Sequence, residues 1–288
     1  MKNFHFHSLY KKIIGLDRAK RKALCAGDGL KCVTRDELER IASLPRFSAG
    51  QTNILGIPFK FHDGLSFVVT YKEIFEREIY RFNQSGDART ILDCGANIGL
   101  SVLYFAVNYS HHNILAFEPD PDIFRLLDEN VRSFNLRNVK LFNKAVWERD
   151  EVLTFYTDGG MGGRVLNVYA NQESRSVEAV RLMDFLTEDV DFLKIDIEGA
   201  EDRVLKSCLG SLRLAKHIFF EYHNDIAKKQ TLHELLHLAQ SEGFHYYIKE
   251  SGTRQRPFVD DELICDTYDM AINVFCYREI SQLHQDLK

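Results

Sequence analysis

The sequence predicts a doubly wound α/β fold with a central, mostly parallel sheet, and three observations support this prediction. From residue 90 onward, short apolar segments alternate with longer helical patterns, which is typical of α/β units. The first apolar segments contain few polar residues, as expected of strands that are buried on both faces. A glycine-containing turn joins the first of these segments to an apolar helix, as in α/β sheets that bind ligands.

The residues before this alternation are predicted to form a small N-terminal helical and hairpin extension. We therefore divide the chain into an extension over 1–87 and a main domain over 88–288. In order, the extension is expected to contain a basic helix over 9–24, a strand over 53–61, a His-Asp-Gly turn at 62–64, a strand over 66–71 and a helix from Glu73 to about Phe82.

Seven strands and four helices are expected in the main domain. The last two strands have no helical pattern between them, so we expect an antiparallel pair at one edge of the sheet. Two extra strands are expected over 151–156 and 177–182. The main strands are predicted over 90–93, 113–118, 138–143, 191–196, 216–222, 244–249 and 271–277, and the helices over 99–108, 121–134, 199–208 and 229–242.

Composition and charge exclude several classes of protein. The 288 residues are 45% hydrophobic and 27% charged, which argues against a disordered chain. No apolar stretch approaches the roughly 20 residues of a transmembrane helix, and the N-terminus lacks the pattern of a secretory signal. The acidic main body argues against a nucleic-acid partner, which would need a clustered positive surface.

The basic leader and the cysteines bear on location. Residues 1–50 carry 11 Lys+Arg against 5 Asp+Glu. Their helix could make a peripheral contact with an anionic surface or a partner, and an ordinary solvated helix is the alternative. The six cysteines form no CxxC pair or disulfide framework, which favours a reducing compartment and hence a cytoplasmic protein.

A glycine loop and an acidic residue predict a cofactor site. The segment ILDCGANIG (91–99) runs from an apolar strand into a helix, and Glu118 ends the next strand, where it can accept ribose hydroxyls. Asn97 replaces a glycine of the dinucleotide pattern GxGxxG, and the Asp93 carboxylate would repel a pyrophosphate. An ammonium and a sulfonium would suit this loop, and S-adenosylmethionine carries both.

Three segments resemble the signature blocks of FkbM-type S-adenosylmethionine-dependent methyltransferases. They are ILDCGANIG (91–99), AFEPDPDIFRLLDEN (116–130) and FLKIDIEGAE (192–201), and the resemblance extends over about 55–250. It implies a Rossmann-like class I methyltransferase fold and O-methylation of a hydroxyl on a sugar, a polysaccharide or a natural product. The partner would then be a small-molecule or glycan acceptor.

The same resemblance implies roles for individual residues. Glu118 would hold the ribose, Ala145 would lie against the adenine, and Asp196 would face the methyl group. The methionine side would be lined by Asp93, Gly95, Ala96, Asn97 and Gly99.

Transfer to a hydroxyl requires a group that removes its proton. His223 follows the fifth strand and is the best placed base, although an ordinary structural histidine is an equal alternative. Asp196 is expected to act as a base or to orient the acceptor, with Glu198 beside it. Alternatively, Asp196, Glu221 and His223 could hold Mg²⁺, although metal-free transfer is preferred.

Two other functions compete with methyl transfer. His233, Glu234 and His237 form a literal HExxH motif, which would make the chain a zinc metallohydrolase if a third ligand were present. A non-catalytic cofactor-binding scaffold is the other alternative, because a fold does not imply a function. The glycine run at 159–163 reads equally well as a lid or as a hairpin turn.

Overall fold

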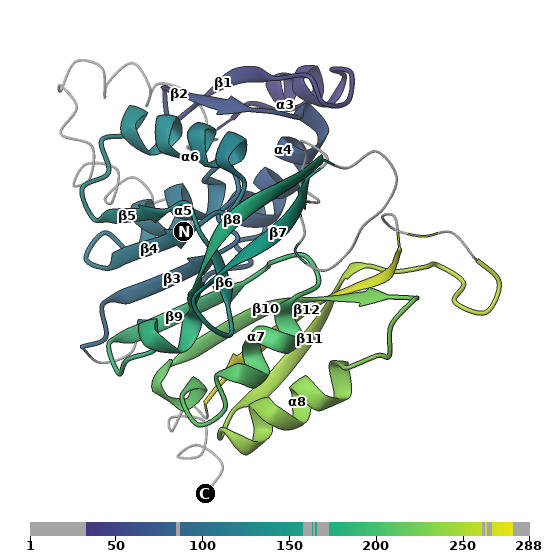
Figure 1. Cartoon of the computed structure of the whole chain (residues 1–288). Coiled ribbons are helices and arrows are strands. Elements are labelled where there is room, and N and C mark those ends of the chain that lie inside the picture. Colours follow the sequence, from purple (N-terminus) through teal and green to yellow (C-terminus); the bar gives the residue numbers. More distant parts are fainter. Residues whose placement is uncertain are drawn as a thin grey trace, which may run out of the picture.

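A seven-stranded sheet forms the centre of the molecule (Figure 1). β12 runs antiparallel to both of its neighbours, and the other strands are parallel to one another. The predicted α/β architecture and the antiparallel pair at one edge are therefore confirmed. Across the sheet the strands are β11 (His245–Gly252), β12 (Tyr268–Tyr277), β10 (His217–Asp225), β9 (Val190–Ile195), β3 (Thr90–Cys94), β4 (Asn113–Phe117) and β5 (Val139–Phe142).

The computed structural model describes residues 33–84, 87–157, 163, 165, 173–260, 263 and 267–278. The helix predicted over 9–24 lies outside these residues, as does all but the last residue of the glycine run at 159–163. No helix within the described residues is long and apolar enough to cross a membrane.

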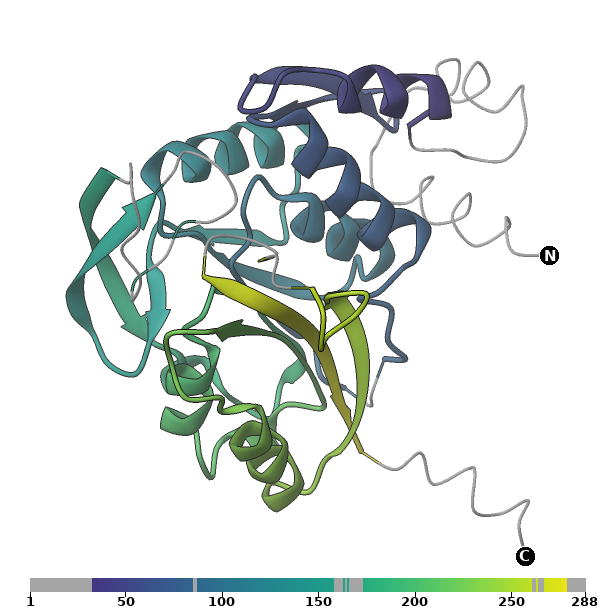
Figure 2. The same cartoon turned by 90° about the vertical axis from the view of Figure 1, so that its right-hand side faces the viewer.

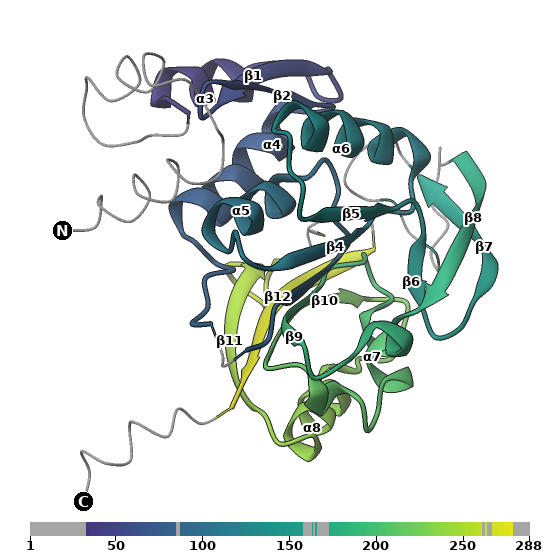
Figure 3. The ribbon, with the colours of Figure 1, turned by 90° about the vertical axis from the view of Figure 1, so that its left-hand side faces the viewer.

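Helices cover both faces of the sheet (Figures 1 and 3). α5 is the most enclosed, with every residue from Leu100 to Val107 buried. The side chain of Asp120 caps α6 by accepting hydrogen bonds from the backbone N–H groups of Asp122 and Ile123. One face carries α5 (Leu100–Asn108) and α6 (Pro121–Ser133), and the other carries α7 (Glu201–Ser207) and α8 (Leu232–Ser241).

A separate three-stranded sheet projects beside the central one. Its order is β6 (Ala145–Trp147), β8 (Glu173–Arg181) and β7 (Glu151–Thr157), so both predicted extra strands are present. β6 escapes prediction because three apolar residues show no alternation.

The hairpin of the extension is shorter than predicted, and the second predicted strand is wrong. β1 (Gly50–Ile54) pairs with β2 (Ile57–Phe61), so both hairpin strands precede the His-Asp-Gly turn. Residues 66–71 belong to a helix, α4 (Gly64–Tyr71). Their β-branched residues favour a strand, but the Asp63 carboxylate accepts a hydrogen bond from the Ser66 backbone and caps a helix instead.

The helix predicted from Glu73 to Phe82 is also only partly correct. α4 continues directly into a π-helical turn, η1 (Lys72–Glu76), and the chain leaves the helix before Glu78, whose φ is 51°. A further helix, α3 (Arg35–Ala42), precedes the hairpin; its buried Leu38 and Ile41 are too few for the periodicity to reveal it.

The extension and the central sheet share one apolar core. The ring of Tyr80 lies 5.7 Å from that of Phe105 on α5 and 4.9 Å from that of Phe219 on β10. β2 also bonds to α6, because the Lys60 backbone N–H donates to the Asn130 Oδ1 atom at 2.8 Å. Figure 2 shows the extension lying over the helices on the sheet face that carries α5 and α6.

Candidate active site

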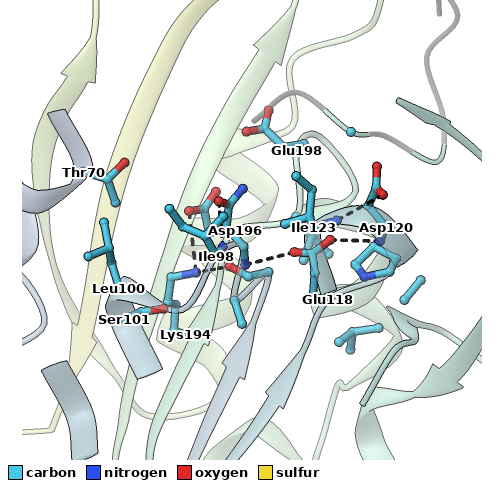
Figure 4. Close-up of a pocket in the computed structure, with 18 of the residues that line it drawn as sticks. Thr70, Ile98, Leu100, Ser101, Glu118, Asp120, Ile123, Lys194, Asp196 and Glu198 are labelled. Atoms are coloured by element: carbon cyan, nitrogen blue, oxygen red, sulfur yellow. Dashed lines mark hydrogen bonds and ion pairs between the residues drawn. The ribbon is translucent and has the colours of Figure 1, made fainter. Parts of the chain in front are cut away.

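A pocket lies at the carboxyl ends of β3, β4 and β9 (Figure 4). It encloses about 1050 Å³, including the space that is open to solvent. Open α/β sheets bind ligands at this edge, where neighbouring crossovers diverge. Its walls are formed by residues of α4 and η1, by the glycine loop at 95–98, by 118–120 after β4, by 145–146 on β6 and by residues between 194 and 200.

The glycine loop brings its backbone unusually close to β9. Gly95 has a φ of 82°, and a Cβ atom at this position would lie 1.8 Å from the backbone oxygen of Asp196. The N–H groups of Gly95 and Ala96 both donate to the Phe117 carbonyl, which ties the loop to β4. Asn97 is also left-handed, with a φ of 47°. The loop therefore requires glycine at position 95 and leaves its backbone facing the pocket.

Glu118 presents a fixed carboxylate to the pocket. One oxygen accepts a hydrogen bond from the Asn97 backbone and the other accepts one from the Asp120 backbone, both at 2.9 Å. Burial raises the pKa of Glu118 to about 7. A ligand hydroxyl that donates to this carboxylate would favour its ionised form.

An apolar wall follows Glu118. The predicted Ala145 lines the pocket, and Val146, Ile123 and Phe155 line it as well. Ile123 comes from the first turn of α6, and Phe155 comes from β7, whose position depends on tertiary packing. The wall suits a flat apolar group such as an adenine.

Two predicted cofactor residues do not line the pocket. Gly99, with a φ of 96°, caps α5, where a Cβ atom would lie 2.7 Å from the Leu127 side chain. The Asp93 side chain is fully buried and lies 3.3 Å from Lys194 Nζ. Lys194 itself lines the pocket, although the sequence predicts no role for it. The available signal is a lysine within a strand that is buried throughout, because such a residue needs a buried counter-ion.

Acidic residues gather beyond Asp196 around His223. The His223 Nδ1 atom lies 3.1 Å from a Glu201 carboxylate oxygen, and its Nε2 atom lies 3.7 Å from Glu198 and 4.0 Å from Glu221. Burial alone would lower the pKa of His223, but these carboxylates raise it well above its ordinary value. The surrounding carboxylates thus favour the protonated form of the His223 imidazole.

The carboxyl group of Glu221 has a raised pKa. Burial raises the pKa of Glu221 to about 7, and the Asp196 carboxylate adds to the increase. The Ser251 hydroxyl donates a hydrogen bond to Glu221 at 2.6 Å. A carboxylate with a pKa close to neutral can accept a proton from a reacting group.

Glu221 belongs to a polar row that crosses the end of the sheet. The register places Glu221 opposite Asn273 on β12, and Asn273 opposite Lys249 on β11. These three side chains therefore share one face of the sheet. Asn273 is 2% exposed, and its Oδ1 atom accepts no hydrogen bond among the described residues.

Two groups of possible metal ligands were predicted, and the structure assembles one of them. Single ligand atoms of Asp196, Glu221 and His223 lie within 4.8 Å of one another. In the part of the chain that the structure describes, the HExxH residues belong to no such group. His233 is largely exposed, and Glu234 is paired with Lys206 and Lys229, which lower its pKa to about 2.

The pocket residues fit the cofactor that the sequence predicts. A buried carboxylate stands where a ribose would donate hydrogen bonds, and an apolar wall adjoins it. Gly95, Ala96 and Asn97 of the glycine loop line the other end of the pocket, together with Asp196. These groups match an adenosine at one end and a cationic amino-acid portion at the other.

Comparisons with known proteins agree with this fit. A family model described as "Methyltransferase FkbM domain" matches residues 93–246. Methyltransferase 1 of Beauveria bassiana is 32% identical over 164 residues, which cover 47% of this chain and 65% of that protein. Methyltransferase sdnD of Sordaria araneosa is 30% identical over 183 residues, which cover 47% of this chain and 66% of that protein. The matches thus span just under two thirds of both curated relatives.

Among solved structures, a SAM-dependent methyltransferase from Agrobacterium tumefaciens is similar with a TM-score of 0.44 and 11% identity. The similarity covers 82% of this chain and 72% of that one.

Proposed function

The chain belongs to the FkbM methyltransferase family, and we propose that it moves the methyl group of S-adenosylmethionine to a hydroxyl oxygen of a sugar, a glycan or a natural product. The observation that carries this proposal is the pocket in which the glycine loop, Glu118 and Asp196 meet. When bound, S-adenosylmethionine supplies a methyl group that is already activated by its sulfonium. The chain must then bind, align and deprotonate the acceptor.

Three parts of the pocket would hold the cofactor. Glu118 accepts the ribose hydroxyls with a carboxylate that two backbone N–H groups keep in place. Ala145 and its apolar neighbours cover the adenine. Gly95 and Asp196 receive the methionine portion, where a carbonyl and a carboxylate suit an ammonium.

Glu221 is the base that we propose for the reaction, in place of His223. Bound S-adenosylmethionine would supply the methyl carbon and leave as the neutral thioether, and the Glu221 carboxylate would take up the proton of the acceptor hydroxyl. Its pKa of about 7 suits this role. His223, held in its charged form by Glu198 and Glu201, orients the surrounding carboxylates. Asp196 orients the acceptor at the boundary between the two substrates.

The polar row supports an acceptor that is rich in hydroxyls. Glu221 and the Asn273 Oδ1 atom are both able to accept a hydrogen bond from an acceptor hydroxyl, and Lys249 on the adjacent strand is able to donate one. Neighbouring hydroxyls of a sugar would satisfy these groups together. An acceptor hydroxyl that donates to the Asn273 Oδ1 atom would satisfy this buried oxygen.

The reaction needs no metal in this proposal. An Mg²⁺ ion at Asp196, Glu221 and His223 would face the Lys194 ammonium, which lies 3.6 Å from the Asp196 carboxylate. The His223 Nδ1 atom is already paired with Glu201. Mg²⁺ also prefers oxygen ligands to imidazole.

Transfer of a labelled methyl group tests the proposal directly. The full chain is incubated with S-adenosylmethionine labelled in the methyl group and a panel of neutral glycosides and polyhydroxylated natural products. We expect label in at least one acceptor as a methyl ether, and equal rates with and without a chelator. Cofactor binding without any transfer would favour the scaffold, and activity that returns only with added Mg²⁺ would favour the metal.

Location is proposed on separate grounds. Cys94, Cys208 and Cys276 are buried free thiols, which suits a reducing compartment such as the cytoplasm. The basic helix predicted over 9–24, which lies outside the described residues, is proposed to make peripheral contacts with anionic surfaces. Fractionation of cells that express the full chain, with and without residues 1–32, tests both.

A further inference from the structure

We propose that Lys194 is a positioning residue of the cofactor site: its ammonium fixes the Gly95 carbonyl and the Asp196 carboxylate, and Asp93 serves as its buried counter-ion. The inference rests on the proposed cofactor site and describes how the chain builds its methionine end. It also assigns Asp93 a role that acts through Lys194 and not on the cofactor itself.

The Lys194 ammonium lies at the junction of the glycine loop and β9. Its Nζ atom is 2.8 Å from the Gly95 carbonyl oxygen and 3.4 Å from that of Cys94. The same atom is 3.3 Å from an Asp93 carboxylate oxygen and 3.6 Å from one of Asp196. Figure 4 shows Lys194 beneath Asp196 at this end of the pocket.

These contacts leave no donor for a ligand. An ammonium has three N–H groups, and four acceptor oxygens already lie within 3.6 Å of Lys194 Nζ. The side chain is only 2% exposed, although it forms part of the pocket wall. Lys194 therefore acts on the groups around it, and the carbonyl and carboxylate that it holds are the ones that face the cofactor.

Asp93 is built into the sheet as a counter-ion. The register places Asp93 directly opposite Lys194 on the neighbouring strand. Asp93 is fully buried, and its two oxygens accept no ordinary hydrogen bond from the described residues, so the ammonium is the group that compensates its charge. A buried carboxylate without such a partner is strongly unfavourable.

The glycine loop is consequently held from two sides. On one side, the Gly95 and Ala96 N–H groups bond to the Phe117 carbonyl of β4. On the other side, Lys194 bonds to the Gly95 carbonyl, and the Asp196 N–H bonds to the Cys94 carbonyl. Loss of the lysine contact frees the carbonyl to rotate, and the Asp196 carboxylate loses the charge that orients it.

A double-mutant cycle on Lys194→Met and Asp93→Asn tests this role. Affinity for S-adenosylhomocysteine is measured by calorimetry, and thermal stability is measured on the same samples. We expect Lys194→Met to weaken binding at least about tenfold and to lower the Tm, since a charge-assisted hydrogen bond is lost. The neutral pair Asp93→Asn/Lys194→Met should recover part of the Tm and none of the affinity, so it carries the test even if the single variant does not fold.

A second probe separates positioning from general damage. 5′-Methylthioadenosine lacks the amino-acid portion, so its affinity should stay within about twofold of the native value in the neutral pair. Lys140→Met, the same substitution on an exposed position of β5, is the matched control and should change neither affinity.

Three results would overturn the assignment. Native S-adenosylhomocysteine affinity in the neutral pair would mean that the ammonium only neutralises Asp93. If the losses of S-adenosylhomocysteine affinity in Asp93→Asn and Lys194→Met added up in the pair, Asp93 would contact the cofactor itself. An equal loss for 5′-methylthioadenosine would mean that the lysine supports the fold alone. A native chain that binds neither probe would instead refute the cofactor site, and this is established before any variant is made.

Discussion

At the scale of single residues, the surroundings of Glu221 and His223 change which of the two is expected to act as the base. Histidine is the usual base near neutral pH, yet the carboxylates around His223 raise its pKa and favour its protonated form. Burial and the Asp196 charge bring the pKa of Glu221 to about 7 instead. The environment therefore decides which of the two groups can accept a proton.

The substitution Glu221→Gln tests this exchange. Because Glu221 must be ionised to accept a proton, we expect kcat of the native protein to rise with pH up to about 7 and then to level off. In Glu221→Gln, kcat should fall about 100-fold and this rise should disappear. The measurement is the pH dependence of single-turnover methyl transfer.

Glu250→Gln, at an exposed position of β11, is the matched control for Glu221→Gln. It should leave the profile unchanged. If kcat of Glu221→Gln still rose with pH and the midpoint of that rise were unchanged, another group would be the base.

The sequence predicts some of the site residues and not others for physical reasons. Gly95 and Glu118 are predictable because their roles depend on local geometry, a left-handed turn and the end of a strand. Lys194 and Asn273 are not, since each acquires its role from a residue on another strand. Asp93 is predicted to line the methionine side, whereas its side chain lies 3.3 Å from Lys194 Nζ and does not line the pocket.

At the scale of elements, the glycine loop shows how closely two strands approach. The Cβ atom of an alanine at position 95 would lie 1.8 Å from the Asp196 backbone oxygen, at a φ that L-residues rarely adopt. We expect Gly95→Ala to lose about 2–3 kcal/mol of unfolding free energy and most of its S-adenosylhomocysteine affinity. Urea unfolding and calorimetry measure the two effects.

The variant Gly210→Ala separates the effect of backbone strain from the effect of a steric clash at the Cβ atom. Gly210 has a nearly equal φ of 83°, but nothing lies within 4 Å of the corresponding Cβ position. It should lose only about 1 kcal/mol and should bind normally. Equal losses in the two variants would contradict the close approach of the loop and β9.

Helix α4 shows where sequence reasoning fails for an element. Three consecutive β-branched residues (68–70) favour a strand, whereas the capping side chain of Asp63 and the buried Phe67 and Tyr71 favour a helix. Propensity is the weaker signal here, because Phe67 of α4 packs against Phe59 and Phe61 of β2 and this packing decides the outcome. The strands β3, β4, β5 and β9 are predicted to within one residue at each end, and the apolar runs of β3 and β9 reflect burial on both faces. The strands β10, β11 and β12 extend up to three residues beyond their predicted bounds.

At the scale of the whole molecule, the extension and the main domain share one core, and we propose that they unfold together. Phe67 on α4 is 1% exposed and packs against Phe59, Phe61 and Tyr71. Phe67→Ala should cost about 3–5 kcal/mol. Trp147, the single tryptophan, lies on β6 and reports from the main domain. Its fluorescence transition in urea should shift to the same midpoint as the circular dichroism.

The control for this cooperativity is Phe258→Ala. Phe258 is fully exposed, so its removal should leave the midpoint unchanged. A Phe67→Ala protein whose Trp147 transition stays at the native midpoint would show that the extension unfolds as a separate unit.

The reversed direction of β12 has a consequence for how such a protein can diversify. β12 pairs antiparallel with β10 and places its Asn273 opposite Glu221, and Lys249 follows on β11; both residues come from a part of the chain beyond the family match at 93–246. The wall formed by α4 and η1 lies before that match. Both chain ends thus supply the surface that would meet the acceptor, while the matched middle supplies most of the cofactor cradle. Substitutions outside the family match can therefore change the acceptor that is bound while the proposed cofactor site stays unchanged.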